Sequence, residues 1–233
     1  MKKILLASGC SYTDPTYFSI FHPNMDCNWP KWPELLAKKL DMEVMNVGYS
    51  GAGSEFIYSS LLDKMLEHKS KIGLVVAGWS RACRRDWAVQ NGDTMYLNRN
   101  EKWDKVGDNK YFIERHLRYV YSLQQVCKSL KIPLKQVQII NSWEQAKWHK
   151  DSKIWPEAQG KVLTRERHYE IIYKSPYAKL INDDFIGHLG CPALGGYSIQ
   201  DFFTDNDYIS DEDRHPNAKG HQLIASKIYE QLD

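Results

Sequence analysis

The sequence lacks several features that would assign it to a special class of protein. Its 31 lysines and arginines nearly balance 29 aspartates and glutamates, so a net charge of +2 gives no reason to expect nucleic acid as a partner. No apolar run approaches the roughly 18 residues of a membrane span, and we find no repeat or low-complexity tract. With 233 residues, 42% of them hydrophobic, the chain is expected to form one domain, residues 1–233.

Cysteine pairs are also missing. The five cysteines are odd in number and form no C-x-x-C pair, which argues against a disulfide framework or a cysteine zinc site: Cys10, Cys27, Cys83, Cys127 and Cys191. The opening MKKILLASGC is not a convincing export signal, because its apolar part, residues 4–7, is shorter than the roughly 7–15 residues required. We therefore expect a cytoplasmic protein that is not attached to a membrane.

What is present is an alternation of two patterns. Short apolar runs predict strands, and stretches with apolar residues every three to four positions predict helices, of which the second is capped by Ser54. The predicted strands are 3–8, 42–48, 72–78 and 137–141, and the predicted helices are 32–40, 54–68, 113–130 and a last one opening at Pro216. This order indicates an α/β fold, a three-layer sandwich with a mainly parallel, flavodoxin-like sheet. The stretches 82–111 and 142–210 do not fit and are expected to be insertions beside the site.

Polar and glycine-rich segments follow the predicted strands at the edge where such sheets bind ligands. They are SGCSYTD after the first strand, NVGYSGAGS after the second, AGWSR after the third and DEDRHPNAKGH before the last helix. A bland sheet edge would need only turns at these points. The four segments are therefore the candidates for a functional site.

The last segment is the most specific. EDRHPNAKGH fits the pattern D-x-x-H-P-N-x-x-G-H at His215, Pro216, Asn217, Gly220 and His221. Together with SGCS and NVGYSGAGS in this order, it resembles the blocks of the SGNH (GDSL-like) hydrolase family. The resemblance covers the first third and the end of the chain, and residues 82–210 do not align.

The resemblance implies a role for each matched residue. Ser11 stands at the nucleophile's position, preceded by Cys10 where the family has Asp, and His215 stands at the position of the base. Glu212, three residues before the histidine, is the expected orienting acid, with Asp213 as the second choice. A serine hydroxyl needs such an imidazole to take its proton.

The resemblance also implies an oxyanion site. Its donors would be the backbone N–H groups of Ser11 and Gly51 and the side chain of Ser80, which replaces the family's asparagine. Trp79 and Arg81, beside Ser80, are candidate substrate contacts, because arginine suits carboxylate or phosphate groups and aromatic rings can cover sugars or acyl groups. Further tryptophans in the two insertions suggest carbohydrate binding: Trp87, Trp103, Trp143, Trp148 and Trp155.

Two residues near these motifs have competing interpretations. Cys10 is a possible nucleophile, but neighbours on a strand point to opposite faces, so Cys10 is expected in the core if Ser11 faces the site. His221 lies six residues after His215, a spacing that does not stack two side chains on one helix face, so we expect a structural histidine rather than a metal pair. No metal and no cofactor are predicted.

These observations predict a serine esterase or carbohydrate O-deacetylase acting on a small-molecule or carbohydrate ester, without nucleic acid or membrane partners. An alternative is a non-catalytic carbohydrate-binding protein on a degenerate scaffold, because the third block lacks the family's Asn and Asp. An α/β transferase or nucleotide-binding module, in which GYSGAGS cradles phosphate, is a further alternative, although the segment has no Walker lysine and no G-x-G-x-x-G spacing. The oligomeric state and the substrate's acyl and alcohol groups are not predicted.

Overall fold

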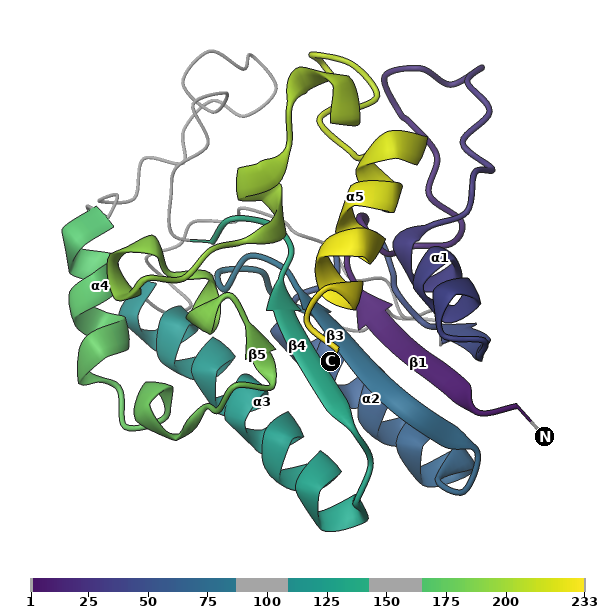
Figure 1. Ribbon diagram of the computed structural model, residues 1–233. Helices are drawn as coiled ribbons and strands as arrows, with labels where there is room; N and C mark the ends of the chain where they lie inside the picture. The colour runs from purple at the N-terminus through teal and green to yellow at the C-terminus, as the bar shows by residue number, and fades with distance from the viewer. Residues whose placement is uncertain (1, 87–108, 143–164, 233) are drawn as a thin grey trace, which may run out of the picture.

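The computed structural model describes residues 2–86, 109–142 and 165–232 (Figure 1). Five strands form one parallel sheet in the order β2-β1-β3-β4-β5. They are β1 (Ile4–Gly9), β2 (Glu43–Asn46), β3 (Ile72–Trp79), β4 (Leu134–Gln138) and β5 (Phe185–Ile186). The predicted α/β fold with a parallel sheet is confirmed.

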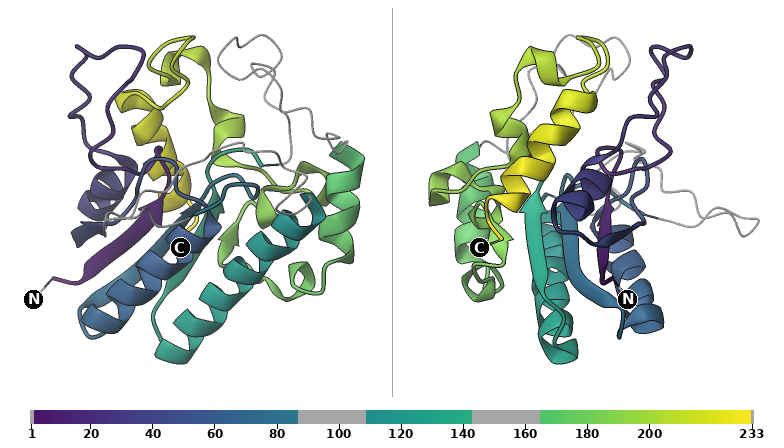
Figure 2. Two further views of the ribbon diagram at one scale, coloured as in Figure 1. Left: turned by 180° about the vertical axis from the view of Figure 1, so that it is seen from behind. Right: turned by 45° about the vertical axis from the view of Figure 1, so that its right-hand side comes forward.

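Helices cover both faces of the sheet. In Figure 2, the view from behind has α2 and α3 in front of the strands, and α5 lies on the face turned to the viewer in Figure 1, packed against α1. A further helix, α4, packs against α3. The helices are α1 (Trp32–Lys39), α2 (Ser54–His68), α3 (Asn109–Leu130), α4 (Arg165–Lys174) and α5 (Ala218–Tyr229).

The central strands form the core because their side chains are apolar on both faces. Every residue of β1 is buried, and Leu5, Leu6, Val75 and Val76 are fully enclosed between the helix layers. A strand covered by helices on both faces favours such uninterrupted apolar runs over alternation. The buried strands hold their carboxyl ends, and hence the loops that follow, in fixed positions.

The region predicted as the insertion 142–210 contributes to the sheet itself. It contains α4 and β5, whose Ile186 pairs with Val137 of β4. It also contains five short 3-10 helices, Ala178–Leu180, His188–Gly190, Pro192–Leu194, Ile199–Phe202 and Asp205–Asp207. A strand of two residues has too little sequence pattern to be recognised. Residues 87–108 and 143–164 of the two predicted insertions, with all five of their tryptophans, lie outside the described residues.

Two helix starts differ in their capping residues. Ser54 was expected to cap α2, but it is the first helical residue, and the Asp86 carboxylate accepts hydrogen bonds from the N–H groups of Gly53 and Phe56 instead. At α5, Asn217 is the cap and accepts from the N–H groups of Lys219 and Gly220. Both caps fix loops at the carboxyl edge of the sheet.

Candidate active site

Ser11 and His215 meet at the carboxyl edge of the sheet, although they are 204 positions apart in the sequence. Ser11 lies two residues beyond β1, and His215 lies shortly before α5. The Ser11 Oγ is 2.9 Å from Nε2 of His215. A serine hydroxyl at this distance can pass its proton to the imidazole.

A buried carboxylate holds the other nitrogen of the imidazole. Nδ1 of His215 donates to Oδ1 of Asp213 at 2.6 Å, and Asp213 is fully enclosed. Burial by itself would raise the pKa of Asp213, but hydrogen bonds from His215, Ser19 and Tyr17 outweigh it and lower the pKa to about 2. Since the ionised carboxylate can only accept, it fixes the proton on Nδ1 and leaves Nε2 free to accept from Ser11.

The prediction that Glu212 would contact the imidazole is wrong. Glu212 is exposed, and its pKa is lowered by hydrogen bonds from its own backbone and from Ser210. Asp213 takes the position because its Oδ1 accepts both the backbone N–H of His215, at 3.2 Å, and Nδ1 of the same residue. This local turn, in which an Asp side chain accepts from the backbone two residues on, suits a spacing of two rather than three.

The loop after Ser11 curls tightly. The N–H groups of Thr13 and Asp14 both donate to the carbonyl oxygen of Cys10. A Cβ at Gly9 would lie 2.1 Å from Oγ1 of Thr13, so only glycine permits this approach. The Thr13 hydroxyl in turn accepts from Nε1 of Trp32.

The same loop is fastened to the segment that carries His215. The Tyr12 hydroxyl donates to the carbonyl of Arg214 at 2.5 Å, and Nε2 of His22 is 2.8 Å from Oγ of Ser210. Together with the contact between Ser11 and His215, these bonds hold two distant segments of chain in one arrangement. Sequence reasoning assigned no role to Tyr12 or His22.

Asp14, which sequence reasoning also missed, ties the loop after β1 to the loop after β2. One carboxylate oxygen accepts from the N–H and hydroxyl of Thr16, and the other accepts from the N–H and hydroxyl of Ser50. Gly51 follows with φ of +86°, a conformation that favours glycine. Asp14 therefore fixes the residue next to the predicted oxyanion donor. An acidic residue three positions after the serine was the available signal.

Ser80 does not occupy the role that was predicted for it. It is buried, and its hydroxyl donates to the carbonyl oxygen of Ala52 at 2.8 Å. A hydroxyl has one proton to donate, so this bond removes Ser80 as a donor to an oxyanion. Arg84 donates to the same carbonyl. The two side chains therefore fix Ala52, the residue after Gly51.

Trp79 is not a substrate contact either. It is the last residue of β3, fully buried, and its Nε1 donates to Oε1 of Gln136. Arg81 is partly exposed, and burial is the main cause that lowers the pKa of its guanidinium. Its charge opposes the rise in the pKa of Tyr12, the residue that follows Ser11.

Cys10 and His221 have structural surroundings. Cys10 is fully buried in the hydrophobic core. His221 is buried in α5 and accepts a hydrogen bond from the backbone N–H of Trp32. Burial, with the charges of Lys31 and His215, lowers its pKa to about 3.

Within residues 2–86, 109–142 and 165–232, no group of three or more His, Cys, Asp or Glu side chains could hold a metal ion. The helices described are also too short or too polar to span a bilayer.

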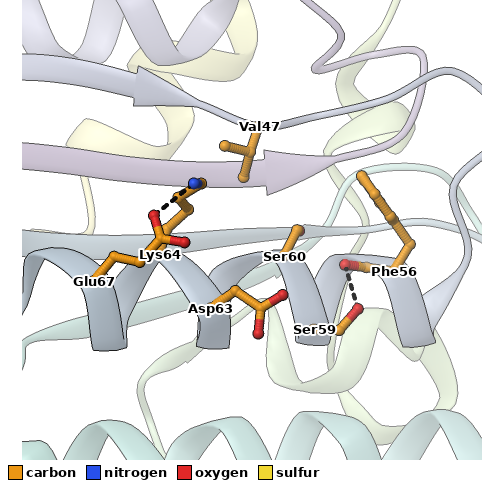
Figure 3. Close-up of a pocket in the computed structure, with 7 residues that line it drawn as sticks. All are labelled: Val47, Phe56, Ser59, Ser60, Asp63, Lys64 and Glu67. Atoms are coloured by element: carbon orange, nitrogen blue, oxygen red, sulfur yellow. Dashed lines mark hydrogen bonds and ion pairs between the residues drawn. The ribbon is translucent and has the colours of Figure 1, made fainter. Parts of the chain in front are cut away.

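A cavity of about 210 Å³ lies along α2, away from the pair of Ser11 and His215 (Figure 3). In its wall Lys64 pairs with Glu67 at 2.6 Å, and the Ser59 hydroxyl donates to the carbonyl of Phe56. We assign no ligand to it. A second hollow, about 410 Å³, lies within the loop of residues 16–28 and is lined by Tyr17, whose ring packs against His215.

Solved structures of other proteins share the fold of this chain. No family model and no curated protein matches the sequence. Among solved structures, the esterase EstA from Pseudoalteromonas sp. is similar, with TM-score 0.53, 13% identity and coverage of 99% of this chain and 96% of that chain. A variant of Axe2, an acetyl xylan esterase from Geobacillus stearothermophilus, gives TM-score 0.51, 13% identity and coverage of 98% and 94%. A protein of the G-D-S-L family from Desulfitobacterium hafniense DCB-2 gives 0.50, 14% and 99% of both chains. The chain therefore shares the α/β fold of these three proteins.

Proposed function

We propose that the protein is a serine esterase that hydrolyses small carboxylic esters, including acetyl esters of carbohydrates, by acyl transfer to Ser11. The observation that carries this proposal is the chain of two hydrogen bonds from Ser11 through His215 to the buried Asp213. The folds of two esterases, one of them an acetyl xylan esterase, support it.

The reaction follows from these contacts. Oγ of Ser11 attacks the ester carbonyl while its proton moves to Nε2 of His215, and the Asp213 carboxylate stabilises the resulting imidazolium. When the C–O bond to the alcohol breaks, Nε2 returns the proton to the leaving oxygen. Water then attacks the acyl-enzyme with the same imidazole as base, releasing the acid and restoring Ser11.

The negative charge on the carbonyl oxygen needs fixed donors. We assign this role to the N–H groups of Ser11 and Gly51. Gly51 suits it because its neighbours are held on both sides, Ser50 by Asp14 and Ala52 by Ser80 and Arg84. Donors that are already in place need no reorganisation during the reaction.

Covalent labelling tests the proposal. The purified protein, treated with a fluorophosphonate probe and digested, should carry the label on the peptide that contains Ser11, and Ser11→Ala should remain unlabelled. A folded protein that binds an acetylated oligosaccharide but takes no label would instead be a non-catalytic binding protein. Label on the peptide of Cys10 alone would move the nucleophile to that thiol.

A further inference from the structure

The hydroxyl of Tyr17 reaches the carboxylate that supports His215. Its Oη lies 2.9 Å from Oδ2 and 3.1 Å from Oδ1 of Asp213. Because the carboxylate is ionised and can only accept, the phenol must donate. Asp213 is fully enclosed, so bulk water does not compete for these oxygens.

The ring of Tyr17 also contacts the imidazole directly. The two ring centroids are 4.4 Å apart and the planes are inclined by 32°. The ring of Tyr12 packs against the same imidazole, with a centroid distance of 5.6 Å. Tyr17 therefore touches both members of the ion pair that forms when His215 takes up a proton.

Tyr17 shares the Asp213 carboxylate with His215 and Ser19. Oδ1 accepts from the backbone N–H and the Nδ1 of His215, at 3.2 Å and 2.6 Å. Oδ2 is the oxygen to which Tyr17 is nearer. A donor on Oδ2 stabilises the carboxylate and draws negative charge away from the oxygen that faces the imidazole.

We infer that Tyr17 is a positioning residue: its hydroxyl fixes the Asp213 carboxylate and sets the pH at which His215 takes up its proton. The inference rests on the proposed function for its catalytic meaning. Tyr17 does not touch the reacting atoms of the ester. It acts through Asp213 and His215.

Several other titratable groups lie near His215. Burial raises the pKa of Tyr17, with the charge of Asp213 adding to it, and burial also raises the pKa of Tyr12. The pKa of His221, lowered to about 3 mainly by burial, keeps that ring uncharged. The charged groups farther out are Arg214, paired with Asp205 and Asp211 at the surface, Arg81, which acts on Tyr12, and Lys31, which acts on His221. His22 also faces this segment, with its Nε2 2.8 Å from Oγ of Ser210, so the protonation of His215 must be followed on its own ring.

The test removes the hydroxyl and keeps the ring. In Tyr17→Phe, Asp213 no longer accepts a hydrogen bond from the phenol, so more of its negative charge acts on the imidazole. The pH at which half of His215 is protonated should then rise by about half a unit or more. The midpoint is measured by NMR titration of the His215 ring and by the acid limb of kcat/KM for 4-nitrophenyl acetate. The same variant should lose about tenfold in kcat/KM at pH 7. Tyr173→Phe, at an exposed position of α4, is the matched control.

A second variant at position 17 separates loss of the hydrogen bond from loss of the fold. Tyr17→Gln keeps a donor and should return the midpoint toward the wild-type value. An unchanged midpoint in Tyr17→Phe, an equal shift in Tyr173→Phe, or unfolding of both variants at position 17 would overturn the inference. Because the NMR titration needs no turnover, a shifted midpoint without any ester hydrolysis would refute the proposed function and leave the assignment of Tyr17 standing.

Discussion

Two serine–histidine pairs in this molecule have nearly equal hydrogen bonds and very different surroundings. Ser11 and His215 are 2.9 Å apart at the sheet edge, and Ser54 and His116 are 2.8 Å apart between α2 and α3. The side chain of His215 is 30% exposed and is held by Asp213, whereas His116 is 1% exposed and packs edge-on against the ring of Trp79.

A short hydrogen bond between a serine and a histidine does not by itself make the histidine a good base. Burial, with a smaller contribution from the charge of Arg115, lowers the pKa of His116 to about 3, so this imidazole resists accepting a proton. His215, in contrast, donates from Nδ1 to the Asp213 carboxylate and has its Nε2 toward Ser11. Access for a substrate and a buried carboxylate, rather than the length of the bond to serine, mark the pair that suits acyl transfer.

The largest expected effect comes from removing each serine in turn. Ser11→Ala should lower kcat for short activated esters by on the order of 10⁴-fold to 10⁶-fold, because no nucleophile remains. Ser54→Ala is the matched control and should keep kcat within about threefold, at a cost in stability of about 1 kcal/mol from the lost hydrogen bond to Nδ1 of His116. Initial rates of the two purified variants make the comparison. Similar losses in both would mean that the buried pair also matters for catalysis.

The carboxylate behind His215 gives the next largest effect. Asp213→Asn should reduce kcat by roughly 10⁴-fold, because a neutral amide neither stabilises the imidazolium nor fixes its tautomer. Glu212→Gln, the neighbouring exposed position, should stay within about twofold. A greater loss in Glu212→Gln than in Asp213→Asn would restore the assignment that the family spacing suggested.

The buried pair should control stability in acid. Burial lowers the pKa of its histidine, His116, from the ordinary 6.5 to about 3, so below pH 6.5 the unfolded chain binds a proton that the folded chain does not. The free energy of unfolding should therefore fall by about 1.4 kcal/mol for each unit by which the pH is lowered below 6.5, because of His116. His221 adds a similar slope. The pKa of Asp213 is lowered from 3.8 to about 2, so its carboxylate stabilises the folded state above pH 3.8. That stabilisation is lost only as the pH falls from about 4 to about 2.

Urea denaturation between pH 6.5 and pH 4.5 measures this slope. His116→Gln should reduce it by about one proton, since glutamine does not titrate. Equal slopes in wild type and His116→Gln would show that His116 is protonated in the folded state.

Much of the frame of the site could be predicted from sequence. The long apolar runs of β1 and β3 and the periodicity of α2 carry strong local signals, and the parallel sheet then requires the loops after its strands to meet at one edge. The contact between Ser11 and His215 follows from that geometry. These features depend on patterns that extend over many residues.

The remaining details depend on the direction of single side chains, which pattern does not encode. Glu212 has the family's spacing, but a turn that closes on Asp213 turns it outward. Trp79 and Ser80 were placed in the site because they follow the run of β3, whereas Trp79 is its final residue and the Ser80 hydroxyl turns to Ala52. The two-residue strand β5 was missed because pairing with β4, rather than its own sequence, creates it.

The separation of 204 positions between the proposed nucleophile and its base has a consequence during synthesis. A ribosome releases the β1 loop long before the segment that carries His215. A nascent or prematurely terminated chain that ends before His215 therefore carries the serine without its partner. The contact between Ser11 and His215 can form only after both segments have left the exit tunnel.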